Sequence, residues 1–150
     1  MSNVKAINTY LANLAVWNVK LHNLHWNVKG QFFMPIHNYT EKLYNEVFEA
    51  YDDVAEVLKM RGELPLASMK AYLEAATIKE IETRVISCCE VHDILVNDIE
   101  HMMKAAMAIL EEAAKEDDFQ VQAMFEEYIN AFRKELWMLR AMKKDEGCSL

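Results

Sequence analysis

Two histidines and two carboxylates have the residue types of metal ligands, and they lie on the first two of several predicted long helices. The set consists of His25, His37, Asp52 and Glu56. Imidazole nitrogens and carboxylate oxygens suit Fe(II), and the same donors also suit zinc. The sequence therefore predicts a non-haem iron site, with zinc left open as an alternative occupant.

Spacing along the second predicted helix, over residues 35–61, prevents one chain from closing such a site alone. At a rise of about 1.5 Å per residue, Asp52 lies roughly 22 Å and Glu56 roughly 28 Å from His37. His25 and His37 flank the turn between the two helices, so they can meet at one end of the molecule. We therefore expect two half-sites, which a two-fold contact between chains would bring together reciprocally.

The two carboxylates are predicted to point away from the core of their own chain. At about 100° per residue, both lie nearly opposite the apolar stripe of their helix. The adjoining flank is too aromatic for a purely solvated surface, and it carries His37, Tyr44, Phe48, Tyr51 and Ala55. This flank is predicted to be a subunit interface.

Ordinary structural roles remain open for the same residues. Two acids on an outward helix face are most often solvated, and a histidine near a helix C-terminus, such as His25, often interacts with the helix dipole or makes a core hydrogen bond. His22 shares a face with His25 and could be a ligand or a support. An internal di-iron centre is disfavoured, because it requires a Glu-x-x-His pair on each of two helices and the chain has no such pair.

Composition predicts the elements that must position these residues. The chain has 150 residues, 53% of them hydrophobic, with only three glycines and two prolines. This favours a single all-α domain over residues 1–150. Thr77 and Glu80 have the spacing of a capping box and predict the start of the third long helix. Apolar periodicity and breaks predict long helices over 4–29, 35–61, 78–115 and about 118–143, with a short helix within 63–76. Four long helices with one long connection match a bundle with one crossover.

Charge and hydropathy disfavour two classes of partner. The formal net charge is −8, which repels phosphate backbones, so intrinsic DNA binding is not expected. No apolar run approaches the length that spans a membrane, and the N-terminus lacks the pattern of a signal peptide. The expected localisation is cytoplasmic.

Three stretches of the chain read LHNLHWNVKGQFFMPIH, YDDVAEVLKMRGELPLASMKAYLEAATI and LWMLRA. They resemble the Dps miniferritins, the family of DNA-binding proteins from starved cells. The resemblance implies a ferritin-like four-helix bundle with a short extra helix between the second and third helices. It also implies a hollow homo-dodecamer with ferroxidase sites at dimer interfaces. The implied ligands are His25 and His37 from one subunit and Asp52 and Glu56 from its neighbour.

Two further residues receive roles from the same resemblance. Glu41 matches a supporting acid of the metal site. Trp26 matches a tryptophan packed beside the site, which either intercepts stray oxidising equivalents or packs the interface. The tail over 143–150 mixes lysine with acidic residues instead of forming the lysine-rich segment with which some relatives bind DNA.

The implied activity is that of a ferroxidase. Fe(II) would be oxidised to Fe(III), with hydrogen peroxide as the preferred oxidant, and ferric mineral would be stored in the shell. The result would be iron storage and detoxification. A non-redox divalent-metal buffer or a structural oligomeric bundle is the alternative, and DNA compaction is the least expected function for this acidic chain.

Overall fold

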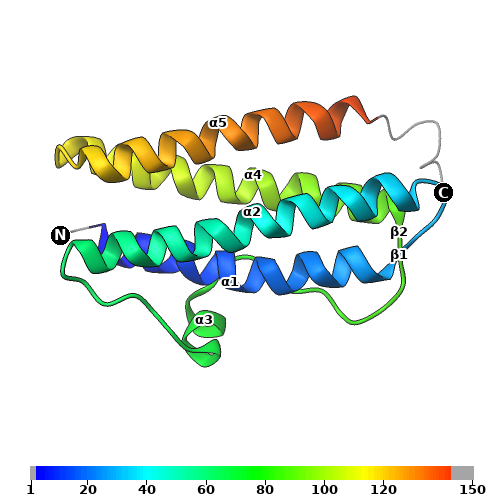
Figure 1. The fold of residues 1–150 in the computed structure, drawn as a ribbon, viewed down its shortest axis with the longest axis horizontal. Coiled ribbons are helices and arrows are strands. Elements are labelled where there is room, and N and C mark those ends of the chain that lie inside the picture. Colours follow the sequence, from blue (N-terminus) through cyan, green and yellow to red (C-terminus); the bar gives the residue numbers. More distant parts are fainter. Residues whose placement is uncertain (1–2, 143–150) are drawn as a thin grey trace.

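Four long helices form an antiparallel bundle, as the sequence predicted (Figure 1). The computed structural model describes residues 3–142. Within that range the elements are α1 (Val4–Asn27), β1 (Val28–Lys29), α2 (Phe33–Met60), α3 (Met69–Ala75), β2 (Ile86–Ser87), α4 (Cys88–Lys115) and α5 (Phe119–Ala141). The short helix α3 lies in the connection between α2 and α4, where a short helix was expected. The predicted end of the last helix at residue 143 lies outside the described residues.

The bundle consists of two helical hairpins joined by a crossover. α1 packs against α2, and α4 packs against α5. The chain leaves α2 at one end of the bundle, passes α3 beside α1, and returns to the opposite end before α4 begins (Figure 1). There, β1 pairs in parallel with β2, with Val28 opposite Ile86 and Lys29 opposite Ser87. This two-residue pairing was not predicted, and it links the α1–α2 turn to the start of α4.

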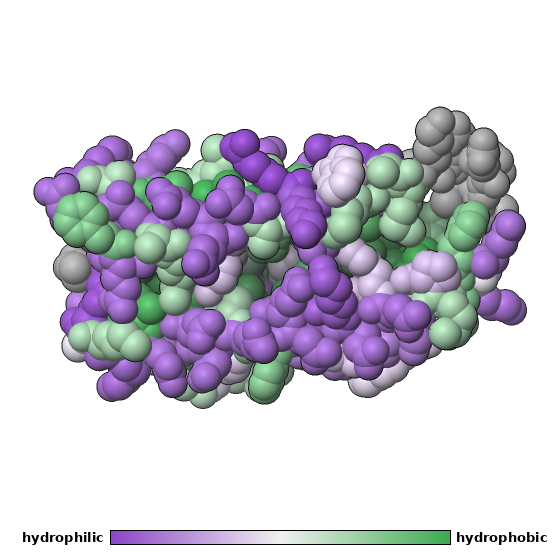
Figure 2. Space-filling view, turned by 45° about the horizontal axis from the view of Figure 1, so that its top comes forward, coloured by the Kyte–Doolittle hydropathy of each residue, from purple (hydrophilic) through white to green (hydrophobic). Residues whose placement is uncertain are grey.

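Apolar stripes of the four long helices meet in one core, which agrees with the predicted periodicity. Trp17, Leu21 and Leu24 of α1 are fully buried, as is Leu95 of α4. The largest buried side chains also include Tyr10 and Phe125, Tyr10 of α1 meeting Phe125 of α5 edge to face at 4.9 Å. Charged and polar side chains cover most of the face in Figure 2. Among the described residues, no helix combines the length and apolar character needed to cross a membrane.

The predicted start of the third long helix at Thr77 is wrong. α4 begins at Cys88, and Ser87 caps it by accepting a hydrogen bond from the backbone N–H of Glu90. Thr77 lies in the crossover connection, where its N–H donates to Asn13 Oδ1 at 2.7 Å. Asn13 thus satisfies the backbone of this segment in a non-helical conformation. Ser87 and Glu90 have the same capping-box spacing as Thr77 and Glu80.

Gly30 fixes the turn that brings the two predicted ligand histidines together. Its φ of +144° is a conformation that residues with a Cβ rarely adopt. A Cβ at this position would also lie 2.9 Å from Sγ of Cys88, at the start of α4. The turn therefore requires glycine for two reasons, backbone conformation and close packing.

Candidate metal centre

His25 and His37 form a stacked pair at one end of the bundle. Their ring centroids lie 3.7 Å apart with an interplanar angle of 15°. His25 Nδ1 lies 2.7 Å from the carbonyl oxygen of His37, and His37 Nδ1 lies 2.9 Å from the carbonyl oxygen of His25. A carbonyl only accepts hydrogen bonds, so each Nδ1 carries the proton and donates. In the neutral rings the lone pairs are then on the two Nε2 atoms, as metal ligands require.

Thr40 supports this pair, and the sequence analysis did not identify it. Its hydroxyl oxygen lies 3.1 Å from His25 Nδ1 and within hydrogen-bond distance of the carbonyls of Ile36 and His37. Such outer contacts fix the orientation and tautomer of a ligating histidine. The available signal was the spacing of Thr40 three residues after His37, which places both on one helix face.

Burial favours the neutral form of His25. Its side chain is only 6% exposed. Desolvation lowers the pKa of His25 below its usual value; the nearby His37 and His22 also lower it, whereas the hydrogen bond to the His37 carbonyl and the charge of Glu41 oppose the shift. A neutral imidazole is the form that binds a metal ion, so the environment favours the ligand state.

Asp52 and Glu56 lie far from the histidine pair on the exposed surface of α2. Both side chains are exposed, as predicted from their direction. Fifteen positions of α2 separate Asp52 from His37, or about 22 Å along the helix. Within residues 3–142, no three histidine, cysteine or acidic side chains are close enough to hold a metal ion. The chain thus brings together the two histidines and leaves the two carboxylates apart from them.

The side chains beside the histidine pair combine polar and exposed aromatic groups. Glu41 is exposed, and its carboxylate accepts a long hydrogen bond of 3.5 Å from the Tyr44 hydroxyl. His22 stacks on Tyr44 at 3.9 Å. Trp26 is 69% exposed and lies 5.5 Å from the ring of His22. Further along α2, Phe48 is 62% exposed. The single chain therefore leaves an aromatic surface uncovered around its candidate ligands.

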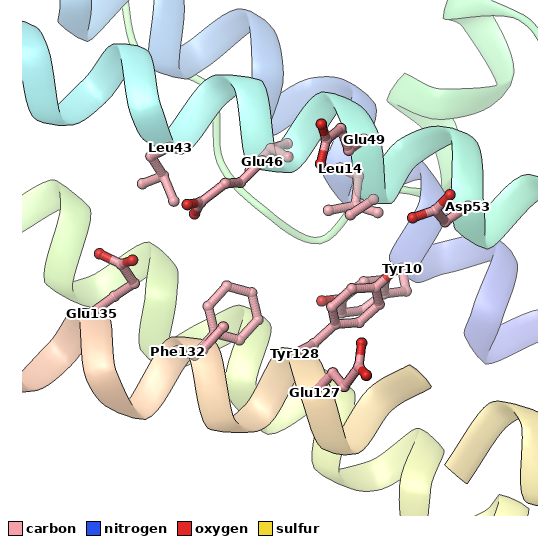
Figure 3. A pocket seen from close by; sticks show the side chains of 13 residues that line it. Tyr10, Leu14, Leu43, Glu46, Glu49, Asp53, Glu127, Tyr128, Phe132 and Glu135 are labelled. Carbon is pink, nitrogen blue, oxygen red and sulfur yellow. The ribbon is translucent and has the colours of Figure 1, made fainter. Parts of the chain in front are cut away.

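A separate acidic groove lies between α2 and α5 (Figure 3). It encloses about 310 Å³, and its acidic residues are Glu46, Glu49, Asp53, Glu127 and Glu135. Glu46, Glu49 and Asp53 belong to α2. At about 100° per residue, they lie on the flank of α2 opposite to that of His37. No histidine lines the groove. It is therefore distinct from the candidate metal centre.

Comparisons with known proteins agree with this fold along almost the whole chain. A model of the ferritin-like domain matches residues 4–146. The DNA protection during starvation protein of Brevibacillus brevis is 36% identical over 135 residues, covering 90% of both chains. The crystal structure of a Dps protein from Bacillus brevis has 34% identity and a TM-score of 0.88, covering 91% of both chains.

A third similar protein is the Dps protein from Vibrio cholerae O1, described as a member of a broad superfamily of ferritin-like diiron-carboxylate proteins. It is 31% identical, with a TM-score of 0.87, and the match covers 91% of this chain and 86% of that one. The chain therefore belongs to the ferritin-like family and, within it, to the Dps proteins. This confirms the resemblance found in the sequence.

Proposed function

We propose that the protein is an iron-storage and detoxification miniferritin, which oxidises Fe(II) at sites shared between two subunits of a dodecameric shell. His25 and His37 of one subunit would bind the metal together with Asp52 and Glu56 of its neighbour. Glu41 would support the site. The observation that carries the proposal is the histidine pair, whose Nδ1 atoms both donate to carbonyls while the Nε2 atoms stay available.

The separation of the carboxylates from the histidines supports sharing between subunits. Both carboxylates are exposed on α2, and the flank between them and His37 carries half-buried and exposed aromatic side chains such as Tyr44 and Phe48. A two-fold axis repeats every contact between the two subunits. One dimer would therefore contain two equivalent sites. The Dps protein from Vibrio cholerae O1, described as a member of the ferritin-like diiron-carboxylate proteins, supports iron rather than zinc as the metal.

Hydrogen peroxide is the oxidant we propose. Two Fe(II) ions each give one electron, the O–O bond breaks, and the two oxygens take up two protons to leave as water. Because two ions react together, peroxide receives two electrons and no hydroxyl radical is released. Transfer of a single electron from one ion would release that radical. Trp26, next to His22 on the exposed surface, would take any stray oxidising equivalent.

The decisive experiment tests whether two inactive subunits complement each other. His37→Ala and Asp52→Ala subunits are dissociated together and reassembled. In a mixed dimer one site has both its histidines and both its carboxylates, so random reassembly restores about one quarter of the sites. Asp52→Ala mixed with Glu56→Ala is the matched control, because every carboxylate half-site then carries a defect. Fe(II) oxidation is followed by absorbance under anaerobic conditions after addition of peroxide.

Recovered oxidation in the first mixture but not in the control supports a shared site. If neither mixture regains activity although mixed dimers form, sharing is wrong. If the Asp52→Ala, Glu56→Ala double variant still oxidises Fe(II) rapidly, these two residues are not ligands of the site. The wild-type protein should consume about one peroxide per two irons, as a particle of about twelve subunits in size-exclusion chromatography.

A further inference from the structure

The acidic groove between α2 and α5 contains a buried hydroxyl that the described chain leaves without a partner. Tyr10 lines the groove and is only 1% exposed, yet its hydroxyl makes no hydrogen bond within residues 3–142. The hydroxyl of Tyr128, whose ring stacks on that of Tyr10 at 6.1 Å, is also unpaired in this part of the chain. Buried polar atoms normally have a partner, because leaving one unsatisfied is costly. We therefore expect a hydrogen-bonding group from outside the chain at this position.

Two carboxylates accompany these hydroxyls, one from each helix (Figure 3). Asp53 comes from α2 and Glu127 from α5, and both line the groove together with the two tyrosines. Burial raises the pKa of Tyr128, and the charges of Asp53 and Glu127 raise it further, so both carboxylates act on the same phenol. Neither carboxylate forms an ion pair within the described range. This end of the groove thus combines uncompensated negative charge with unpaired hydroxyls.

The other end of the groove shows how the two helices hold an ammonium group. Lys42 Nζ lies 2.9 Å from Glu135 Oε1 of α5 and 3.3 Å from Glu46 Oε1 of α2. The hydrogen bond to Glu135 is the largest cause that raises the pKa of Lys42, so the bridging group is a cation. Lys42 therefore supplies a positive charge at its end, whereas no cation of the described chain does so at Asp53 and Glu127.

The carboxylates of α2 are spread along the groove and do not surround one point. Glu46, Glu49 and Asp53 share one face of α2, at intervals of about 4.5 and 6 Å along its axis. Among the described residues, no three acidic, histidine or cysteine side chains are close enough to hold a metal ion. Apolar side chains, including Leu14 and Phe132, line the groove between the charges. Such a groove fits an elongated cation whose charges are separated by short methylene chains.

We propose that the acidic groove binds a linear polyamine, in which methylene chains join several ammonium groups. One ammonium group lies between Asp53 and Glu127, within reach of the Tyr10 hydroxyl. The methylene chain follows the apolar wall to a second ammonium group at Glu49. An ammonium group has three donors and no acceptor, so phenol and carboxylate oxygens both satisfy it. This binding does not depend on the proposed function, because it uses none of the candidate metal ligands.

Spermidine binding to the assembled, metal-free protein tests the proposal by isothermal titration calorimetry. Tyr10→Phe deletes the buried hydroxyl without changing the charge, and it should fold because that hydroxyl has no partner to lose. Tyr72→Phe is its matched control, a buried tyrosine whose hydroxyl makes its hydrogen bonds outside the groove. Glu49→Gln removes one charge of the groove, and Glu74→Gln removes an exposed charge of α3. Thermal unfolding and size-exclusion chromatography establish that each variant assembles.

We expect a single spermidine site per subunit, with an affinity about tenfold lower in Tyr10→Phe and in Glu49→Gln and unchanged in the two controls. Equal weakening in Glu49→Gln and Glu74→Gln, with no effect of Tyr10→Phe, would overturn the proposal, because spermidine then only screens the net negative charge. Mg²⁺ is the competing probe. If Mg²⁺ displaces spermidine at equal concentration and its binding depends on Tyr10, the groove is a metal site instead. Lack of binding to the wild-type protein also overturns the proposal.

Discussion

The imidazoles of His25 and His37 hold each other through reciprocal hydrogen bonds, each Nδ1 donating to the backbone carbonyl of the other residue. The two residues come from α1 and α2, so the pair also ties the end of one helix to the beginning of the next. Both Nε2 atoms are left without the proton. This single relationship positions the ligands and selects their tautomer.

Stability should depend on the protonation of His25. Burial lowers the pKa of His25, so below its usual value of 6.5 the unfolded chain takes up a proton that the folded chain refuses. The free energy of unfolding of the metal-free protein is therefore expected to fall as the pH drops through 6.5. His25→Gln should show a smaller slope in this window. Urea unfolding of both proteins between pH 7.5 and 5.5 measures the difference, and equal slopes would contradict it.

Removing the Thr40 hydroxyl should weaken metal binding without removing any ligand. Thr40→Val keeps the shape of the side chain but deletes the contact with His25 Nδ1. Loss of such an outer contact typically lowers metal affinity by about 10- to 100-fold. Co(II) titration measures the change, with Thr83→Val in the exposed crossover connection as the control. An unchanged affinity would show that the carbonyl of His37 alone is sufficient to orient His25.

The proposed sharing fixes the register of α2 against α2 of the neighbouring subunit. In the proposed site, His37 faces the partner's α2 at the level of Val54, which lies midway between Asp52 and Glu56. The two-fold axis then crosses α2 halfway between positions 37 and 54, close to Asn45. We expect Asn45→Cys to form a disulfide with its own counterpart under mild oxidation. Lys59→Cys, also exposed but far from the axis, should not do so. Mass spectrometry of the linked peptides identifies the pair, and crosslinking at Lys59 instead would indicate another register.

The buried ion pair between α1 and α4 should be costly to break but easier to replace. Lys20 Nζ lies 2.8 Å from Asp98 Oδ2, with side-chain exposures of 5% and 11%. Lys20→Met leaves Asp98 buried without its partner, a change that typically costs about 3–5 kcal/mol. Lys20→Met with Asp98→Leu should recover much of this loss. Thermal or urea unfolding gives both values, and an equally unstable double variant would argue against this explanation.

An exposed ion pair provides the comparison. Lys115 lies 2.6 Å from Glu112 with side-chain exposures of 69% and 47%. Solvent screens such a pair, so Lys115→Ala should leave the unfolding midpoint nearly unchanged. A large loss of stability at this exposed pair would show that burial does not explain the cost of breaking the pair of Lys20 and Asp98.

The cap of α4 should contribute measurably to stability. Ser87→Ala removes the hydroxyl that accepts from the Glu90 N–H and should cost about 1 kcal/mol. Thr83→Ala, in the exposed connection before it, is the control. If urea unfolding gives equal losses for the two variants, the cap at Ser87 contributes nothing specific.

Sequence periodicity predicted the four long helices and the short one because apolar spacing and glycine punctuation are local signals. The prediction failed at the start of α4, where two capping boxes compete. The helix begins after Ser87 and not after Thr77, because Asn13 of α1 accepts a hydrogen bond from the backbone N–H of Thr77. This contact joins residues 64 positions apart. A pattern confined to a few neighbouring residues cannot contain such a contact.

The candidate site divides in the same way between local and distant information. The exposed direction of Asp52 and Glu56 followed from the helical repeat alone and is confirmed. The meeting of His25 and His37 followed from the short turn. The support by Thr40 and the stacking of His22 on Tyr44 depend on how the two helices rotate against each other, which spacing within one helix does not define.

The distribution of the ligands along α2 links activity to assembly. A newly made chain has its histidine pair within one local hairpin, yet its own carboxylates lie about 22 Å away along the same helix. Under the proposed function, an unassembled subunit cannot turn over iron, and ferric product forms only where a partner is already present. Activity would therefore require a subunit concentration high enough for assembly, and this requirement would prevent mineral from forming on free chains. Fusion of two subunits into one polypeptide would remove the requirement.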